Sequence, residues 1–186
     1  MRIIAGRLGG RKLVAPPGAA TRPTADRVRE ALFSVLGDIE GASVLDLFAG
    51  TGALGIEAVS RGAMHATFVE NGRPALRALR QNLHTLELEG TTTVVPIPVE
   101  RALKSASWEP ESFDLVFADP PYILIQNGRF SGALGVAIDR GLAATLRPGG
   151  HVIVEHGSGE RAPEVTGITL EQTRVYGDTA LSFYLR

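Results

Sequence analysis

The chain has 186 residues, of which 44% are hydrophobic and 21% charged, with no cysteine and a formal net charge of −1. This is the composition of a globular protein, and it excludes disulfides, cysteine-based zinc sites and thiol nucleophiles. No apolar run approaches the roughly 18 residues of a membrane span, and Met1–Gly6 lacks the apolar core of a signal peptide. We therefore expect a cytoplasmic protein.

The charge is unevenly distributed along the chain. Residues 1–37 carry seven basic and two acidic side chains, a net of +5, whereas the remainder carries 12 basic and 18 acidic ones, a net of −6. A basic end on a near-neutral protein indicates either a nucleic-acid surface or a solvated basic face. If it is a nucleic-acid surface, we expect the contacts to come from Arg7, Arg11, Lys12, Arg22, Arg27 and Arg29.

The first elements in chain order are two short β-prone runs, Arg2–Ala5 and Arg11–Ala15. Gly9 and Gly10 lie between them, which predicts a hairpin. Thr24 is a candidate N-cap for a helix that apolar spacing carries to Leu36, and Gly37 supplies the stop. We expect residues 1–37 to be an N-terminal hairpin and helix extension, residues 38–186 the main domain, and the whole to be one structural unit.

From residue 43 the pattern alternates between strands and helices. Such repeated units favour an α/β fold with a parallel sheet covered on both faces. The tail differs, because two strand-like runs are joined through Gly177-Asp178. The predicted strands are 43–48, 65–70, 92–98, 113–118, 151–155, 168–176 and 179–186, and the predicted helices are 53–61, 74–88 and 134–146.

A glycine-rich turn follows the first of these strands. Gly50-x-Gly52-x-x-Gly55 matches a nucleotide-binding fingerprint, and Glu70 ends the next strand 20 residues after Gly50. Glycines let a ligand approach the backbone, and an acid at this place can accept hydrogen bonds from ribose hydroxyls. The pattern therefore predicts a cofactor that contains a nucleoside.

Asp46 bears on which cofactor this is. A carboxylate there would repel the pyrophosphate of a nicotinamide dinucleotide but attract the ammonium group of S-adenosylmethionine; it could instead hydrogen-bond the loop. Asp46-x-Phe48-x-Gly50-x-Gly52 resembles the first motif of S-adenosylmethionine-dependent methyltransferases. The predicted cofactor contacts are Asp46, Phe48, Ala49, Gly50, Thr51, Gly52, Glu70 and Asn71.

Asp119-Pro120-Pro121-Tyr122 follows the strand 113–118. Two prolines fix the backbone and remove two donors, which leaves rigid carbonyls free to accept. Asp119 and the Pro120 carbonyl can hold the hydrogens of an exocyclic amine, and the Tyr122 ring can stack on a base without needing its hydroxyl. The segment resembles the [Asp/Asn/Ser]-Pro-Pro-[Tyr/Phe] motif of amino-group methyltransferases, which predicts a catalytic role for Asp119, Pro120, Pro121 and Tyr122.

With both motifs in place, nearly the whole chain resembles the bacterial 16S ribosomal RNA guanine-N2 methyltransferase family. The most family-specific stretch is Arg22–Glu30, and Arg2–Gly6, Gly10–Leu13, Ser60-Arg61 and Val175–Thr179 also match. The resemblance implies a Rossmann-like methyltransferase fold with a seven-stranded, mostly parallel sheet. It also implies S-adenosylmethionine as cofactor and the assembled or partly assembled 30S subunit as partner; we expect a monomer.

Other classes remain open. An amino-group methyltransferase of DNA, ribosomal protein or another RNA would use the same chemistry, a nicotinamide-dependent dehydrogenase would use the glycine turn, and an inactive RNA-binding module could keep the fold. The dehydrogenase leaves Asp119–Tyr122 unexplained, and the inactive module predicts decayed motifs, which are intact here. The four histidines show no ligand spacing, and methyl transfer to an amine needs no metal, so we expect no metal site.

Overall fold

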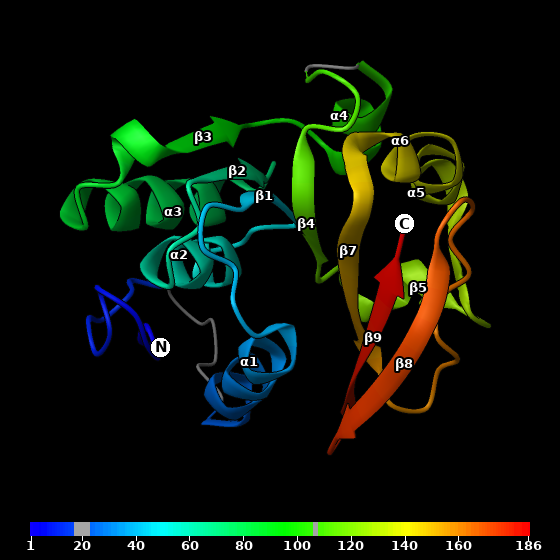
Figure 1. The fold of residues 1–186 in the computed structure, drawn as a ribbon, viewed down its shortest axis with the longest axis horizontal. Coiled ribbons are helices and arrows are strands. Elements are labelled where there is room, and N and C mark those ends of the chain that lie inside the picture. Colours follow the sequence, from blue (N-terminus) through cyan, green and yellow to red (C-terminus); the bar gives the residue numbers. More distant parts are fainter. Residues whose placement is uncertain (17–22, 106–107) are drawn as a thin grey trace. The chain divides into compact units, whose positions relative to one another are not determined.

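The computed structural model of the protein describes residues 1–16, 23–105 and 108–186. These residues form two compact units, Met1–Pro96 and Ile97–Arg186, which are described separately below (Figure 1). The boundary predicted at residue 37 lies within the first of these units. The N-terminal segment belongs to the first unit because its backbone is hydrogen-bonded to that unit's helices.

The first unit is built on three parallel strands in the order β3-β2-β1. They are β1 (Ser43–Leu47), β2 (His65–Val69) and β3 (Thr92–Val95), with Ser43 opposite His65 and Ala66 opposite Thr92. All five residues of β1 are buried, as expected for a parallel strand covered on both faces. Each strand lies within the range predicted for it from the sequence.

Three α-helices accompany these strands: α1 (Pro23–Leu36), α2 (Ala53–Ser60) and α3 (Arg73–Thr85), and a 3-10 turn, η1 (Glu89–Thr91), precedes β3. Helix α1 begins at Pro23, so Thr24 lies inside the helix and the prediction of Thr24 as its N-cap is wrong. Proline is tolerated in a first helical turn because the amide it lacks would have no partner there. The helix ends before Gly37, as predicted, and Gly37 takes a left-handed φ of +71°.

The predicted N-terminal hairpin is present but short: Arg2 and Lys12 form an antiparallel bridge, and the amides of Ile3, Gly10 and Leu13 donate to the carbonyls of Arg11, Ile3 and Met1. The pairing does not extend past Ile3, because the amides of Ile4 and Ala5 donate instead to the carboxylate of Glu57 on α2 at 2.7 and 3.0 Å. Donors used in this way are lost to a second strand. The segment is therefore docked on a helix rather than paired along its length.

Ser60 makes the second attachment of this segment. Its hydroxyl accepts from the Leu8 amide at 3.0 Å and donates to the Ala5 carbonyl at 2.6 Å, while the Arg7 amide donates to the Ser60 carbonyl. Gly6 crosses directly over this point with φ +79°, and a Cβ there would lie 1.9 Å from the Ser60 carbonyl oxygen. The close approach thus requires glycine at position 6.

The second unit contains four strands in the order β4-β7-β9-β8. They are β4 (Phe113–Ala118), β7 (Leu146–Gly157), β8 (Thr169–Tyr176) and β9 (Thr179–Leu185), and β4 lies parallel to β7 while the other pairs are antiparallel. Figure 1 shows β8 and β9 as a long hairpin in orange and red. β7 starts earlier than predicted, because Arg147–Gly150 lies within the strand instead of forming a turn.

The helical segments of the second unit are shorter than predicted. The single helix expected over 134–146 is divided into α5 (Gly132–Ala137), a π-helical turn (Ile138–Leu142) and α6 (Ala143–Thr145), and α4 (Val99–Ser105) was not predicted. A small hairpin follows the Asp119–Tyr122 segment, formed by η2 (Tyr122–Leu124), β5 (Ile125–Gln126) and β6 (Arg129–Phe130). Its Asn127-Gly128 turn has positive φ at both residues, a combination typical of two-residue hairpin turns.

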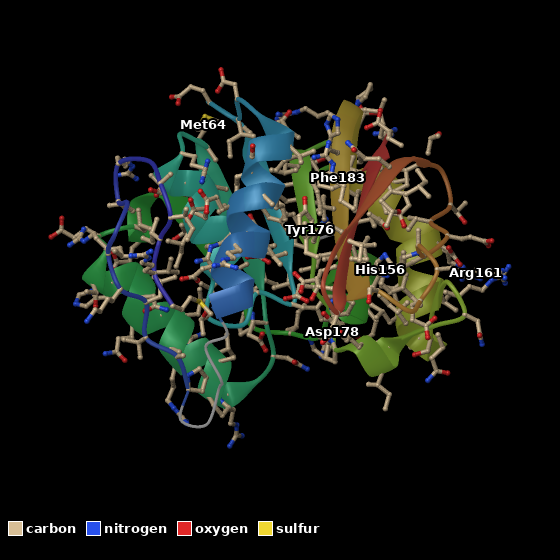
Figure 2. The ribbon with its side chains drawn as sticks, turned by 90° about the horizontal axis from the view of Figure 1, so that it is seen from below. Met64, His156, Arg161, Tyr176, Asp178 and Phe183 are labelled. Atoms are coloured by element: carbon tan, nitrogen blue, oxygen red, sulfur yellow. The ribbon has the colours of Figure 1, made fainter. Side chains whose placement is uncertain are left out.

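A buried polar network joins β7, β9 and β8. The His156 ring, labelled in Figure 2, lies 2.8 Å through Nε2 from the Ser182 hydroxyl, which lies 2.9 Å from the Thr173 hydroxyl. Nδ1 contacts the Gly157 carbonyl, which can only accept, so Nδ1 carries the proton and Nε2 accepts from Ser182. Burial lowers the pKa of His156 from its ordinary value. The ring is therefore a neutral, structural histidine.

The seven strands, three in the first unit and four in the second, run mostly parallel, and helices connect them. This confirms the Rossmann-like α/β class expected from the sequence. None of the helices in the described ranges combines the length and apolarity that crossing a membrane would require.

Candidate active site

The glycine turn of the first unit has an unusual backbone. Phe48, Gly50 and Gly52 all take left-handed conformations, with φ of 64°, 57° and 84°. At Gly52 a Cβ would lie 2.5 Å from Cδ1 of Leu79, so both conformation and packing require glycine. Above Gly50, in contrast, a Cβ position is nearly open, which leaves room for a ligand to approach the backbone.

Glu70 is the residue that ties this turn to the end of β2. One carboxylate oxygen accepts from the Gly50 amide at 2.8 Å, and the other accepts from the amides of Asn71 and Gly72 at 2.9 and 2.6 Å. A carboxylate offers about four acceptor positions, so a partly exposed Glu70 retains capacity for a further donor such as a ribose hydroxyl. Asn71 is exposed beside it.

Asp46 is a buried residue that stabilises the glycine turn. It is only 1% exposed, and its Oδ2 accepts from the Gly55 amide at 2.9 Å. The expectation that it attracts the ammonium group of a cofactor is not supported, because a carboxylate this buried does not present itself to a ligand. Of the two interpretations left open by the sequence, hydrogen bonding of the loop is the one the structure favours.

The Asp119–Tyr122 segment follows β4 in the second unit. Asp119 and Pro121 are exposed, Pro120 is buried, and the exposed fraction of Tyr122 is 44%. The Tyr122 hydroxyl lies 3.0 Å from the Thr179 hydroxyl and, at the long limit of a hydrogen bond, 3.5 Å from Oε1 of Glu155. The ring is thus held at its hydroxyl end while it remains accessible to a stacking partner.

Glu155 brings a second carboxyl to this group. Its pKa is raised to about 8, first by the loss of hydration and then by the charge of Asp119. The pKa of Asp119 is raised to about 6, because surrounding protein atoms remove part of the hydration of its carboxyl group. Burial also raises the pKa of Tyr122. Sequence reasoning missed Glu155, although an acid at the end of the predicted strand 151–155 was the available signal.

The predicted nucleic-acid residues divide into three groups. Four of them are exposed on the first unit: Arg7, Arg11, Lys12 and Arg27. Arg22 lies outside the described residues. Arg29 is a correction, because it is 4% exposed and its guanidinium donates to Asp26 and the Arg2 carbonyl, with Nε 3.7 Å from the Glu57 carboxylate. It is a buried structural cation and does not face a ligand.

No cluster of three or more acidic or histidine side chains with metal-binding geometry occurs within residues 1–16, 23–105 and 108–186. The two units instead present polar side chains and backbone groups that suit organic ligands. One unit carries a glycine turn clasped by an acid, and the other carries an acid and a tyrosine beside a second carboxyl. A nucleoside-containing cofactor fits the first set, and a planar amine-bearing acceptor fits the second.

The fold, the clasped glycine turn and the Asp-Pro-Pro-Tyr segment define a methyltransferase of the Rossmann-like class. Solved structures that share this fold include methyltransferases in complex with S-adenosylmethionine and with S-adenosylhomocysteine; at 24% and 18% identity these show the fold alone. The particular family is shown by a match over residues 1–185. The chain belongs to the family described as "Conserved hypothetical protein 95".

Relatives support this membership over the full length. YlbH of Bacillus subtilis, provisionally named an rRNA methyltransferase, is 38% identical over 99% of this chain and 98% of its own. The solved structure of yhhF from Escherichia coli, provisionally named a methyltransferase, is 32% identical, has a TM-score of 0.81, and is matched over 100% of this chain and 97% of its own.

Ribosomal RNA small subunit methyltransferase D of Escherichia coli is 44% identical over 123 residues, which is 66% of this chain and 60% of that protein. The alignment therefore spans less than two thirds of that relative.

Proposed function

We propose that this protein is an S-adenosylmethionine-dependent methyltransferase that methylates the exocyclic N2 amine of a guanine in 16S ribosomal RNA. The observation that carries the proposal is the Asp119–Tyr122 segment, in which an acid and an accessible ring stand together on a rigid turn. An amine that attacks a methyl group needs acceptors for its hydrogens, and its base needs a surface for stacking.

The cofactor contacts we propose are the glycine turn and the loop after β2. The backbone at Phe48, Ala49, Gly50, Thr51 and Gly52 would approach the amino-acid and ribose portions, while Glu70 and Asn71 would receive the ribose hydroxyls. Glu70 is already held by three backbone amides, so its orientation is preset. Bound S-adenosylmethionine would supply an electrophilic methyl group on a sulfonium, which is a good leaving group.

At the acceptor, Asp119 would accept hydrogen bonds from the amine and Tyr122 would stack on the base. A base within structured RNA must leave its stack to reach such residues. Positioning supplies much of the acceleration in a reaction of this kind, because both reactants are held in attacking geometry. Pro120 and Pro121 contribute by fixing the backbone on which the acid and the ring stand.

We further propose that the exposed basic residues of the N-terminal segment, Arg7, Arg11 and Lys12, and Arg27 of α1 bind RNA phosphates. The names of the relatives support ribosomal RNA as the substrate, and one of them specifies the small subunit. From this we infer action in the cytoplasm, as a monomer, on an assembled or partly assembled 30S particle.

Mass spectrometry of nucleosides from 16S RNA of cells lacking this protein tests the proposal. We expect N2-methylguanosine to decrease and to return with the parent gene but not with an Asp119→Ala variant. An unchanged modification profile in 16S RNA, or a loss confined to DNA, would contradict the substrate. Calorimetry gives an independent test, because tighter binding of NAD than of S-adenosylmethionine would exclude the methyltransferase in favour of a dehydrogenase.

A further inference from the structure

Glu155 is a carboxyl that the Asp-Pro-Pro-Tyr motif does not explain. In the pairing of β4 with β7, Ala118 lies opposite Val154, so Asp119 and Glu155 are the next residues on neighbouring parallel strands. Residues at equivalent positions of adjacent strands point to the same face of a sheet. Register alone therefore directs the two carboxyl groups to one side of the second unit.

Tyr122 connects Glu155 to this site through direct contacts. Its hydroxyl lies between the Thr179 hydroxyl at 3.0 Å and Oε1 of Glu155 at 3.5 Å. Gly157 lies beside the ring, since its Cβ position is 3.7 Å from Cδ2 of Tyr122, an ordinary van der Waals distance. Glu155 and Thr179 thus hold the hydroxyl end of the ring, and Gly157 packs beside it.

We propose that Glu155 is a positioning residue for the acceptor base, which holds a proton beside Asp119 at neutral pH and anchors the hydroxyl of Tyr122. The inference rests on the proposed function, because the base it positions is the acceptor of that reaction. The pair then presents a single carboxylate, that of Asp119.

The electrostatics of the neighbourhood agree with this assignment. The titratable groups that face Glu155 are Asp119, after β4, and Tyr122, on η2, while β9 contributes the non-titratable Thr179. Two carboxylates in one site oppose each other, so one proton is retained. The pKa is raised further for Glu155, to about 8, than for Asp119, to about 6, although the hydrogen bond from the Tyr122 hydroxyl acts in the opposite direction on Glu155, so we assign that proton to Glu155. His156, next in the chain, points to the opposite face and bonds Ser182.

The arrangement suits the proton balance of amine methylation. Asp119 receives the proton that the amine loses when its lone pair bonds the methyl carbon and the carbon–sulfur electron pair remains on sulfur. A neutral Glu155 keeps the number of negative charges at one while the base covers the site. With Glu155 ionised, covering two like charges would oppose docking of the base.

Titration of the Asp and Glu carboxyl carbons by NMR tests the pair without substrate or cofactor. In the parent we expect titration midpoints at about pH 6 for Asp119 and about pH 8 for Glu155. Asp119→Asn should lower the midpoint of Glu155, since it removes one cause of the shift, and Glu155→Gln should abolish the upper transition. Glu171→Gln, an exposed acid on β8 that is 3.9 Å from His151, is the control and should change neither transition.

Single-turnover kinetics test the positioning role. At pH 7, Glu155→Gln keeps a neutral, hydrogen-bonding side chain. Its single-turnover rate should therefore be about tenfold higher than that of Glu155→Ala. In the parent, KM for RNA should rise above about pH 8 with little change in kcat, and this rise should be missing in Glu155→Gln.

These experiments distinguish a failure of the Glu155 inference from a failure of the proposed methyltransferase function. An ordinary pKa for Glu155, or a Glu155→Gln variant as slow as Glu155→Ala, would overturn the inference even if rRNA is methylated. Absence of methylation by the parent would overturn the proposed function, yet the substrate-free NMR titration would still decide whether the carboxyl pair exists.

Discussion

Asn82 on α3 clasps the backbone of Val14 with both ends of its side-chain amide. Oδ1 accepts from the Val14 amide at 2.7 Å, and Nδ2 donates to the Val14 carbonyl and also to the Thr51 carbonyl, both at 3.0 Å. Asn82 is 2% exposed. One buried side chain therefore links the N-terminal segment to the glycine turn.

Replacing Asn82 with Ala should leave three partly buried backbone groups without this partner and lower the free energy of unfolding by ~1–3 kcal/mol. Because one of these groups is the Thr51 carbonyl, affinity for S-adenosylmethionine should fall as well. Urea unfolding and calorimetry measure the two effects. Gln81→Ala, at the exposed neighbouring position of α3, is the control. Full stability in Asn82→Ala would show that the clasp is not structural.

Glu70→Ala should weaken binding of S-adenosylmethionine by ~1–3 kcal/mol, since it leaves ribose hydroxyls and the Gly50 amide without their acceptor. Calorimetry on the folded variant gives the value, with the exposed Glu87→Ala as a matched control. Unchanged affinity would remove Glu70 from the proposed cofactor site.

Asp119→Ala should reduce methyl transfer by roughly 100-fold or more while cofactor affinity is retained, because Asp119 acts on the acceptor. A single-turnover assay with saturating cofactor separates the two. Asp139→Asn, an exposed acid of the same unit, should behave as the parent. An active Asp119→Ala variant would refute the assignment.

We expect methyl transfer to depend on both the ring and the hydroxyl group of Tyr122. Tyr122→Ala removes the ring and with it stacking of ~1–3 kcal/mol. From the sequence, Tyr122→Phe was expected to retain activity, but the hydroxyl is bonded to Thr179, so we now expect a loss of about 2- to 12-fold. Thr179→Val should reproduce that smaller loss, and single-turnover rates that are normal in both variants would show that the ring needs no anchor.

The exposed cations of the N-terminal segment should set the salt dependence of RNA binding. If Arg7, Arg11 and Lys12 each neutralise a phosphate, changing all three to Ala should flatten the slope of log affinity against log salt by roughly two to three units. Binding of the 30S particle at several salt concentrations measures it. A matched triple variant on α3, Arg73, Arg77 and Arg80 to Ala, should keep the parent slope. An unchanged slope in the N-terminal variant would leave only a solvated basic face.

The sequence predicted the strands well because their apolar runs depend on local pattern; β4 was predicted residue for residue. The N-terminal hairpin is shorter than its β-prone runs indicated, because Glu57, more than 50 positions away, accepts from the amides of Ile4 and Ala5. The same distant carboxylate helps to bury Arg29, which no local pattern distinguishes from its exposed neighbours. Asn127-Gly128, between β5 and β6, is a local sequence pattern typical of a hairpin turn.

At the candidate site, sequence identified the two motifs because each is contiguous. It did not identify Glu155 or Thr179, since these reach Tyr122 through the pairing of β7 with β9, which places Gly157 opposite Thr179. It also could not decide the role of Asp46. Its burial and its hydrogen bond from the Gly55 amide, which only the fold reveals, favour the structural role.

The docking of the N-terminal segment has a consequence for the order in which the protein is made. The bonds that fix Ile4, Ala5, Leu8 and Val14 join residues 52 to 68 positions apart. During synthesis the amino end emerges first, yet its partners at Glu57, Ser60 and Asn82 are added only much later. These residues thus leave the ribosome well before their partners, and until α3 is complete this cationic segment lacks the contacts that fix it to the first unit.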